Sequence, residues 1–307
     1  MSLSSRESDH KSQVIKTKTD VYKFTGVKLG KGSFASIYEA VSKKLKKTVA
    51  VKMKSNSEIS LSDKQQMESE ISIMQSVKHP NILKLYEHFA NSKAHYLFME
   101  RMTTDLLEEI LNSNSGKLTT RMTRFFMYQI CTAVKYLHDK NIVHCDLKPE
   151  NILLDQFVTD RSLPLIKLCD FNYARQIGKL SKRISEKGTR HYMAPEILAK
   201  KPHDRSIDIW SLGVIMYVSL VGKFPFAGKN ESYIEAHIKN QMKDNKLFDN
   251  EHFQNAETLT FIKSMLMVNF EKRAPIGMLI KMNYFQRIDL KKDLDVLQKR
   301  IGKKFIK

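Results

Sequence analysis

Alternating apolar and polar residues dominate the first third of the chain. The alternating runs cover 23–30, 35–41, 47–53, 82–89 and 94–102. A period of two residues is typical of half-buried β-strands. Three such runs in close succession predict an antiparallel sheet, because short connections join neighbouring strands of that kind.

One helix is predicted to interrupt these strands. Ser62 and Gln65 have the spacing of a capping box, which predicts that a helix begins there and continues to about Ser76. Ile71 and Met74 would lie on its apolar face. The first part of the chain is therefore predicted to be a sheet with one long helix.

After residue 104 the apolar residues recur with a helical period. Within 119–141 they form one stripe, which consists of Phe126, Ile130, Ala133, Val134 and Leu137. The stretch 208–222 is apolar nearly all round, which predicts a central helix. A β-rich first part and a helical second part predict an α+β protein with two lobes. The predicted boundaries are 22–99 for the N-lobe, 100–104 for the hinge and 105–286 for the C-lobe.

The two ends of the chain differ from the rest. Residues 1–21 are polar and aperiodic, which predicts a flexible leader. Residues 287–307 predict a basic amphipathic helix whose apolar stripe contains Leu290, Leu294, Leu297, Ile301 and Phe305. Two uses of this stripe are open at this point. It could pack on the C-lobe, or it could bind calmodulin or a membrane.

Composition narrows the class of protein. The chain has 307 residues, of which 42% are hydrophobic, enough to bury a sizeable core. No stretch reaches the roughly 18 apolar residues that span a bilayer, and the first 20 residues lack the apolar centre of a secretion signal. Three cysteines without CxxC spacing indicate neither a disulfide framework nor a zinc site. We expect reduced thiols and a cytoplasmic location, or a nuclear one.

The formal net charge of +19 is concentrated at the two ends. Residues 1–55 carry 13 Lys and Arg against 4 Asp and Glu, and residues 278–307 carry 9 against 3. Such a balance can attract nucleic acid or anionic lipid. These positive charges lack the interleaved aromatic residues of a single-strand binder, so we expect solvated surfaces and no nucleic-acid partner.

Two glycines and an inward lysine are candidate phosphate-binding groups. Gly30 and Gly32 lie between two predicted strands, so they belong to a hairpin, where backbone N–H groups can approach phosphates. Lys52 lies within the next predicted strand and faces inward if Ala50 does. A buried ammonium needs a counter-ion, and Glu70 on the predicted helix is the obvious candidate.

A second set of polar residues follows at 143–151, "VHCDLKPEN". It places Asp146, Lys148 and Asn151 close together, and Asp170 follows a predicted strand further along. A hairpin over phosphates, a paired lysine, a carboxylate that orients a hydroxyl, and an Asn with an Asp to hold magnesium are the parts of phosphoryl transfer.

With these motifs in the required order, the chain resembles a eukaryotic protein kinase over residues 22 to about 286. The motifs are the glycine loop, VAVK, HxDLKPEN, DF, APE and DIWSLG. The resemblance implies an enzyme that transfers the γ-phosphate of ATP, with Mg²⁺, to Ser or Thr of protein substrates. It implies catalytic roles for Lys52, Glu70, Asp146 and Lys148, and magnesium ligation by Asn151 and Asp170.

The same resemblance implies further positions. The nucleotide-binding residues would be Leu29, Gly30, Lys31, Gly32, Ser33, Ile37, Ala50, Lys52, Met99, Glu100, Met102, Asp105, Glu150 and Leu153. Met99 would be the gatekeeper beside the adenine, and Glu100 and Met102 would present hinge backbone groups to it. Glu196 would pair with Arg273, and Asp208 would tie the catalytic loop, 143–151, to the central helix.

The resemblance can be narrowed to the protein kinase D family. Cys145 in place of the usual arginine and Cys169 before the DF pair are similar to that family. The likeness implies Ser181 and Ser185 as targets of an upstream activating kinase, and Thr189 as a brace for the catalytic loop. It also implies substrates with an arginine about three residues before the acceptor, since Asp105 and Glu150 suit a basic side chain.

Asn172 departs from the family pattern, which has glycine after the DF pair. Phe171 before it is expected to pack near Met74. Asn is the non-glycine residue best suited to a positive φ, so we predict a left-handed Asn172 that stiffens this turn. Because of the substitution, an alternative stays open, namely a pseudokinase or nucleotide-binding scaffold. An active kinase is favoured because every charged part is present.

Overall fold

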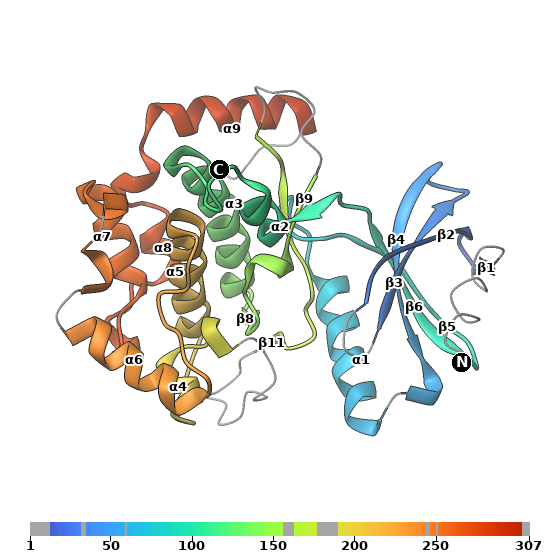
Figure 1. Ribbon diagram of the computed structural model, residues 1–307. Helices are drawn as coiled ribbons and strands as arrows, with labels where there is room; N and C mark the ends of the chain where they lie inside the picture. Colours follow the sequence, from blue (N-terminus) through green and yellow to red (C-terminus); the bar gives the residue numbers. More distant parts are fainter. Residues whose placement is uncertain are drawn as a thin grey trace. The chain divides into compact units, whose positions relative to one another are not determined.

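The structure is a computed structural model that describes residues 13–31, 35–58, 60–155, 163–176, 190–243, 246–249 and 251–302 (Figure 1). The chain divides into two compact units. The first contains the residues up to 78 together with 83–102, and the second contains 79–82 and the residues from 103 onward. The first unit is rich in strands and the second is mainly helical, which confirms the predicted α+β class.

A six-stranded sheet with the order β1-β2-β3-β4-β6-β5 forms the first unit. Its strands are β1 (Val14–Lys16), β2 (Val21–Lys31), β3 (Ser36–Ser42), β4 (Lys47–Ser55), β5 (Leu85–Ala90) and β6 (Ala94–Glu100). Every neighbouring pair is antiparallel, as predicted. The core of this unit includes Tyr22 and Phe98, whose stacked rings are buried together with Phe24, Val51 and Tyr96.

The prediction of a flexible leader over residues 1–21 is wrong for its last part, because residues 14–16 form an edge strand. In β1, Ile15 lies opposite Tyr22 of β2, and its side chain is 7% exposed within the core cluster. The Thr17 hydroxyl donates to Glu87 Oε2 at 3.0 Å, which ties the following turn to β5. A three-residue strand with one buried side chain is too short to produce a periodic pattern.

The helix α1 (Leu61–Ser76) begins two residues earlier than predicted. Its N-cap is Ser60, whose hydroxyl accepts a hydrogen bond from the Asp63 amide, while the Asp63 carboxylate accepts from the Ser60 amide. The reciprocal capping box is thus present, with Asp63 in the third position. The spacing that predicted Ser62 and Gln65 also fits Ser60 and Asp63. The Asp63 carboxylate can accept the hydrogen bond from the N-cap amide that a Gln side chain would accept.

Residues 79–82 belong to the second unit, although the sequence placed them in the N-lobe. Asn81 is fully buried and donates from Nδ2 to Gln129 Oε1 and to the Ile166 carbonyl, both at 2.9 Å. Ile82 forms a parallel bridge with Leu168. These polar contacts, rather than apolar periodicity, decide where the segment lies.

The second unit consists mainly of helices. They are α2 (Leu106–Asn112), α3 (Thr120–Asp139), α4 (Pro195–Leu198), α5 (Ser206–Val221), α6 (Glu231–Lys243), α7 (Ala256–Met265), α8 (Ile276–Leu279) and α9 (Ile288–Ile301). The short strands are β7 (Thr104–Asp105), β8 (Ile142–Val143), β9 (Ile152–Leu154), β10 (Ile166–Leu168) and β11 (Arg175–Gln176). They form two small sheets, β10-β9-β7 and β11-β8.

Short 3₁₀ helices connect several of these elements. They are η1 (Asn56–Glu58) in the first unit, and η2 (Pro149–Asn151), η3 (Arg190–Tyr192), η4 (Lys246–Phe248), η5 (Glu251–Phe253), η6 (Phe270–Lys272) and η7 (Asn283–Phe285) in the second. The predicted central helix corresponds to α5, which is buried along almost all of its length and packs against α3 and α7. Among the described residues, no helix is long and apolar enough to cross a membrane.

The apolar stripe of the last helix packs on the second unit itself. Leu290 and Leu297 of α9 are buried, and α9 contacts α3. Two ion pairs join α9 to α3, namely Asp293 with Arg121 and Asp289 with Arg124, and a third joins Arg300 of α9 to Asp155 after β9. Of the two uses left open by the sequence, the structure shows docking on the C-lobe. Phe305 lies outside the described residues.

The edge strand β1 should stabilise the first unit. We expect Ile15→Ala to lower the free energy of unfolding by about 2 kcal/mol, because it removes buried methyl groups from the core cluster. Chemical unfolding in urea measures the change. Val14→Ala is the matched control, because Val14 lies on the same strand but is 45% exposed and should change stability by less than about 0.5 kcal/mol. Equal effects of the two variants would contradict the assignment of β1.

Candidate active site

In the first unit, Lys52 and Glu70 form the predicted buried ion pair. Lys52 Nζ lies 2.5 Å from Glu70 Oε1, and the two residues are 8% and 1% exposed. Lys52 comes from the middle of β4, and Glu70 comes from α1. Removing one member of such a buried pair is costly, because the other charge is left without compensation. The Glu70 carboxylate therefore holds the ammonium group of Lys52 in position.

The other candidate nucleotide contacts of this unit lie on adjacent strands. Gly30 of β2 pairs with Ile37 of β3, and Ala50 of β4 pairs with Met99 of β6. A side-chain carbon added to Gly30 would meet no atom within 4 Å, so the backbone there faces open space. Leu29 and Lys31 flank Gly30 on β2. Gly32 and Ser33 lie outside the described residues.

One predicted hinge residue, Glu100, has a backbone hydrogen-bond partner within the first unit. The Glu100 amide donates to the Lys84 carbonyl at 3.0 Å within the first unit. This N–H is therefore already bonded, and the prediction that Glu100 and Met102 present backbone groups to an adenine stays a prediction. Met102, the second predicted hinge residue, is 8% exposed.

In the second unit, the catalytic loop brings three predicted residues together. Asn151 Nδ2 donates to the Asp146 carbonyl at 2.8 Å and to Asp146 Oδ2 at 3.0 Å. Lys148 Nζ lies 3.4 Å from the same carboxylate oxygen. Because the Asn151 amide nitrogen is directed at Asp146, its oxygen points the other way. The loop thus presents an oriented carboxylate, an ammonium group and an amide oxygen.

Asp170 follows β10 and lies beside this loop. The Cys169 amide donates to the Asn151 carbonyl at 3.0 Å, and His144 Nε2 donates to the Cys169 carbonyl at 3.1 Å. Asp170 itself has a left-handed backbone with φ of 61°. Phe171 is fully buried, and its ring lies 5.0 Å from that of His144. The backbone contacts therefore hold both predicted magnesium ligands in one part of the unit.

The prediction of a left-handed Asn172 is wrong. The described non-glycine residues with positive φ include Asp170 and Cys145 but not Asn172. The Ala174 amide donates to the Phe171 carbonyl at 3.1 Å, which closes a turn with Asn172 and Tyr173 at its centre. A type I turn has negative φ at both central positions. The Asn172 side chain instead donates from Nδ2 to Asp170 Oδ1.

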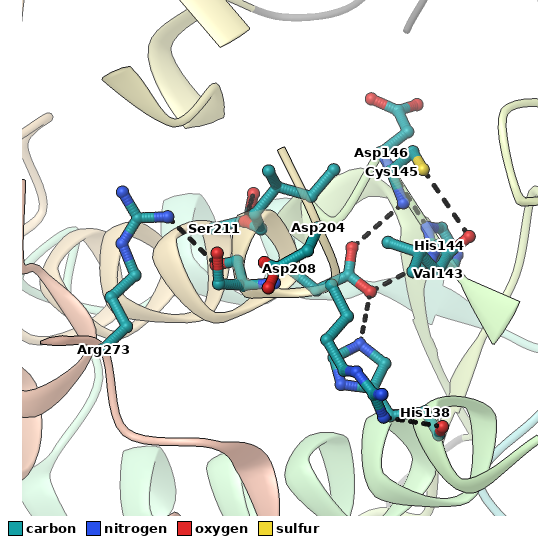
Figure 2. Close-up of polar contacts among 12 residues, drawn as sticks. His138, Val143, His144, Cys145, Asp146, Asp204, Asp208, Ser211 and Arg273 are labelled. Carbon is teal, nitrogen blue, oxygen red and sulfur yellow. Dashed lines mark hydrogen bonds and ion pairs between the residues drawn. The ribbon is translucent and has the colours of Figure 1, made fainter. Parts of the chain in front are cut away.

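Asp208 of α5 anchors the backbone of the catalytic loop (Figure 2). Its Oδ2 accepts from His138 Nε2 at 2.8 Å and from the His144 amide at 3.0 Å. Its Oδ1 accepts from the Cys145 amide at 3.0 Å. Burial by itself raises the pKa of Asp208, but these hydrogen bonds outweigh it and hold the pKa below its ordinary value.

Cys145 occupies a strained position within this arrangement. Its φ is 66°, and its thiol donates weakly to the Val143 carbonyl at 3.6 Å (Figure 2). Burial raises the pKa of the Cys145 thiol, so the side chain stays protonated and behaves as a small hydrophobe. The hydrogen bonds from the His144 and Cys145 amides to Asp208 offset the conformational free energy that a left-handed Cys145 costs.

The predicted pair of Glu196 and Arg273 is also present. Arg273 Nη1 and Nη2 donate to the two Glu196 oxygens at 2.5 and 2.7 Å, and both residues are buried. The guanidinium also lies over the Trp210 ring, 5.1 Å from its centroid. This bidentate pair ties α4 to the segment that precedes α8.

The structure gives the positions of three further predicted site residues, Asp105, Glu150 and Leu153. Asp105 is the N-cap of α2 and accepts from the Glu108 amide at 2.9 Å, while burial raises its pKa. Leu153 of β9 pairs with Asp105, and Glu150 lies in η2. Their predicted contacts with nucleotide or substrate stay predictions. The regulatory residues Ser181, Ser185 and Thr189 lie outside the described residues.

Two contacts of the site were not anticipated from the sequence. His138 lies in the last turn of α3 and reaches Asp208, 70 positions further along the chain. Asn172 bonds the carboxylate of Asp170. The first contact has no local signal, whereas the second could have been found from the Asp-x-Asn spacing, since short polar side chains two residues apart often bond each other in turns.

Comparisons with known proteins agree with this geometry. A family model described as "Protein kinase domain" matches residues 24–285. The chain is 38% identical over 278 residues to serine/threonine-protein kinase D2 of Homo sapiens. The aligned region covers 91% of this chain and 31% of that protein. It is 36% identical over 280 residues to serine/threonine-protein kinase D3 of Homo sapiens, with 91% and 31% covered.

A nematode relative gives the same result. Serine/threonine-protein kinase dkf-2 of Caenorhabditis briggsae is 37% identical over 283 residues, which covers 91% of this chain and 23% of that protein. These relatives confirm the likeness to protein kinase D that the motifs indicated. The chain spans less than a third of the length of each of these three proteins.

The Asp208 anchor yields a prediction about stability and pH. We expect Asp208→Asn to lower the free energy of unfolding by about 2 kcal/mol near neutral pH, because an amide cannot accept from all three N–H donors. The pKa of Asp208 is lower in the folded state than in the unfolded state. Its contribution is therefore complete above the unfolded pKa and is lost as the pH falls through the folded pKa.

Urea unfolding of both proteins at several pH values measures this difference. It should be constant down to about pH 5 and should shrink at more acidic pH. Asp139→Asn is the control, because Asp139 lies in an exposed pair with Lys135 and should matter by less than about 0.5 kcal/mol. A difference that grew on acidification would contradict the assignment of Asp208 as a buried anionic anchor.

Proposed function

The chain belongs to the protein kinase domain family, and from this premise we propose that it is an ATP- and Mg²⁺-dependent serine/threonine kinase of the protein kinase D type. The reaction transfers the γ-phosphoryl group of ATP to a serine or threonine hydroxyl of a protein substrate. The observation that carries the proposal is the catalytic loop, in which Asp146 is oriented by Asn151, accompanied by Lys148 and anchored through Asp208.

Asp146 is the proposed base for the substrate hydroxyl. Its carboxylate is held by the Asn151 amide, so it is oriented before a substrate arrives. Lys148, 3.4 Å from that carboxylate, supplies a positive charge where the transferred phosphoryl group carries negative charge. Positioning of this kind is the main contribution that a protein makes to phosphoryl transfer.

The remaining charged groups fit a nucleotide with its metal ion. Lys52, held by Glu70, is the proposed contact for the α- and β-phosphates. The amide oxygen of Asn151 and the carboxylate of Asp170 are hard oxygen donors of the kind that Mg²⁺ prefers, so these residues would hold it. Bound there, the ion neutralises charge on the phosphates. The open space beside Gly30 is consistent with close approach of the backbone to phosphates.

The rival interpretation, a pseudokinase, rests on Asn172 alone. The structure shows that the residue is accommodated in a turn without positive φ, so glycine is not needed there. Asn172 removes no charged group from the site. The relatives named above are serine/threonine-protein kinases, which supports the active enzyme.

Substrate choice and regulation are finer parts of the proposal. We infer that Asp105 and Glu150 bind a basic residue upstream of the acceptor, because both side chains are carboxylates and neither is fully exposed. An upstream kinase acting on Ser181 and Ser185 is the proposed route of activation, and Ser185 is the more important of the two. A cytoplasmic or nuclear location remains an expectation from the sequence.

The role of Asp146 can be tested by transfer of labelled phosphate from ATP to a peptide with arginine before a serine. We expect Asp146→Asn to lower kcat about 10³-fold, because the oriented proton acceptor is lost while the shape is kept. Asp139→Asn serves as the matched control and should be as active as the wild type, because Asp139 is exposed at the end of α3. Full activity of Asp146→Asn would rule out the proposed base.

Substrate preference is tested separately with a positional peptide library. The wild type should select arginine upstream of the acceptor, and Glu150→Gln should weaken that selection about 10-fold through the loss of one charge-assisted pair. Rates on a peptide without basic residues provide the control and should be similar for both proteins. A library that shows no preference for basic residues would refute this part of the proposal.

A further inference from the structure

The Asn172 side chain has a role that its backbone does not explain. In the family pattern this position is glycine, which is needed where φ is positive. Here φ of Asn172 is not positive, and the turn is closed by the Ala174 amide and the Phe171 carbonyl. The backbone would therefore accept many residues. Its side chain makes a specific contact, a hydrogen bond from Nδ2 to Asp170 Oδ1.

Asp170 is a short side chain on a strained backbone. Its φ of 61° sets the direction of the Cα–Cβ bond, while the rotation of the carboxylate is decided by its partners. The backbone on either side is fixed, since the Cys169 amide bonds the Asn151 carbonyl and the Phe171 side chain is fully buried. A donor from Asn172 therefore acts on a carboxylate whose attachment point is already rigid.

Both candidate metal ligands are oriented by a side-chain amide. Asn151 is itself the donor to Asp146, which directs its own oxygen away from that residue. Asp170 accepts from the amide of Asn172. A carboxylate offers about four acceptor positions on its two oxygens, and the hydrogen bond from the Asn172 amide takes one of them. The Asn172 amide carries no net charge, so it adds no positive charge that would repel the cation.

We propose that Asn172 is a positioning residue for magnesium, which orients the Asp170 carboxylate for the metal before it binds. The proposal rests on the proposed kinase function. Hydrogen-bond partners of metal ligands typically contribute 10- to 100-fold in metal affinity, because they fix the ligand's orientation. Glycine cannot supply this donor from a side chain. The residue that at first suggests a defective kinase thus supports its metal site.

The test compares the wild type with Asn172→Ala and Asn172→Leu. Alanine removes the donor, and leucine removes it while keeping a similar volume. Neither is strained, because φ of this residue is not positive. Each protein is mixed with a non-hydrolysable ATP analogue and titrated with Mg²⁺, and the rise in thermal unfolding temperature is recorded. The quantity compared is the Mg²⁺ concentration that produces half of this rise.

We expect the half-saturating Mg²⁺ concentration to increase about 10-fold in both variants. Phosphate transfer at saturating Mg²⁺ should fall less than about 3-fold, because the metal-bound site contains the same ligands. Gln176→Ala, an exposed position on the same segment, is the control and should match the wild type in both measurements. The unfolding temperature without nucleotide or Mg²⁺ shows whether each variant is folded.

Two results would overturn the proposal. An unchanged half-saturating concentration would show that the Asn172 donor does not orient the metal ligand. A lower one would show that it competes with the metal. If the wild type itself shows no Mg²⁺-dependent rise with the nucleotide, then the proposed function fails as well. A normal response of the wild type with matching responses of the variants would refute only the role of Asn172.

Discussion

The hydrogen bonds accepted by the buried carboxylate of Asp208 are the interactions on which the candidate active site of the second unit depends. Asp208 lies on α5, the most completely buried helix of that unit, and it binds the backbone amides of His144 and Cys145 (Figure 2). Backbone amides at a strained residue need partners, and a buried anion needs donors, so each satisfies the other. The position of Asp146 follows, because it is the next residue along the chain.

From this anchor the site is ordered by a short series of hydrogen bonds. Asn151 holds Asp146, its carbonyl accepts from Cys169, and Asp170 comes next. Each step uses the backbone or a short side chain, so no long flexible side chain is needed to hold these groups. In the first unit, an ion pair between β4 and α1 holds Lys52 in a similar way. The candidate catalytic groups are thus held by short connections to buried elements.

Sequence patterns predicted the parts of this protein that depend on repetition. The sheet and α3 follow from periodic burial, and α5 follows from a stretch that is apolar nearly all round. The ion pairs of Lys52 and Arg273 follow from motifs whose partners are fixed by the fold. Patterns failed where one or two contacts decide. Ile15 anchors a three-residue strand, Asn81 places a segment in the second unit, and a backbone hydrogen bond from Ala174 to Phe171 closes the turn at Asn172. None of these contacts produces a periodic pattern in the sequence.

The central claim is that the charged groups of both units serve phosphoryl transfer. It is tested most directly by the transfer of labelled phosphate from ATP to a basic serine peptide, measured for the wild type and for Asp170→Ala at equal protein concentration. The proposed role of Asp170 predicts transfer by the wild type and a loss of at least about 100-fold in the variant, since a metal ligand is removed. Equal rates in the two proteins, or no transfer by either, would contradict it.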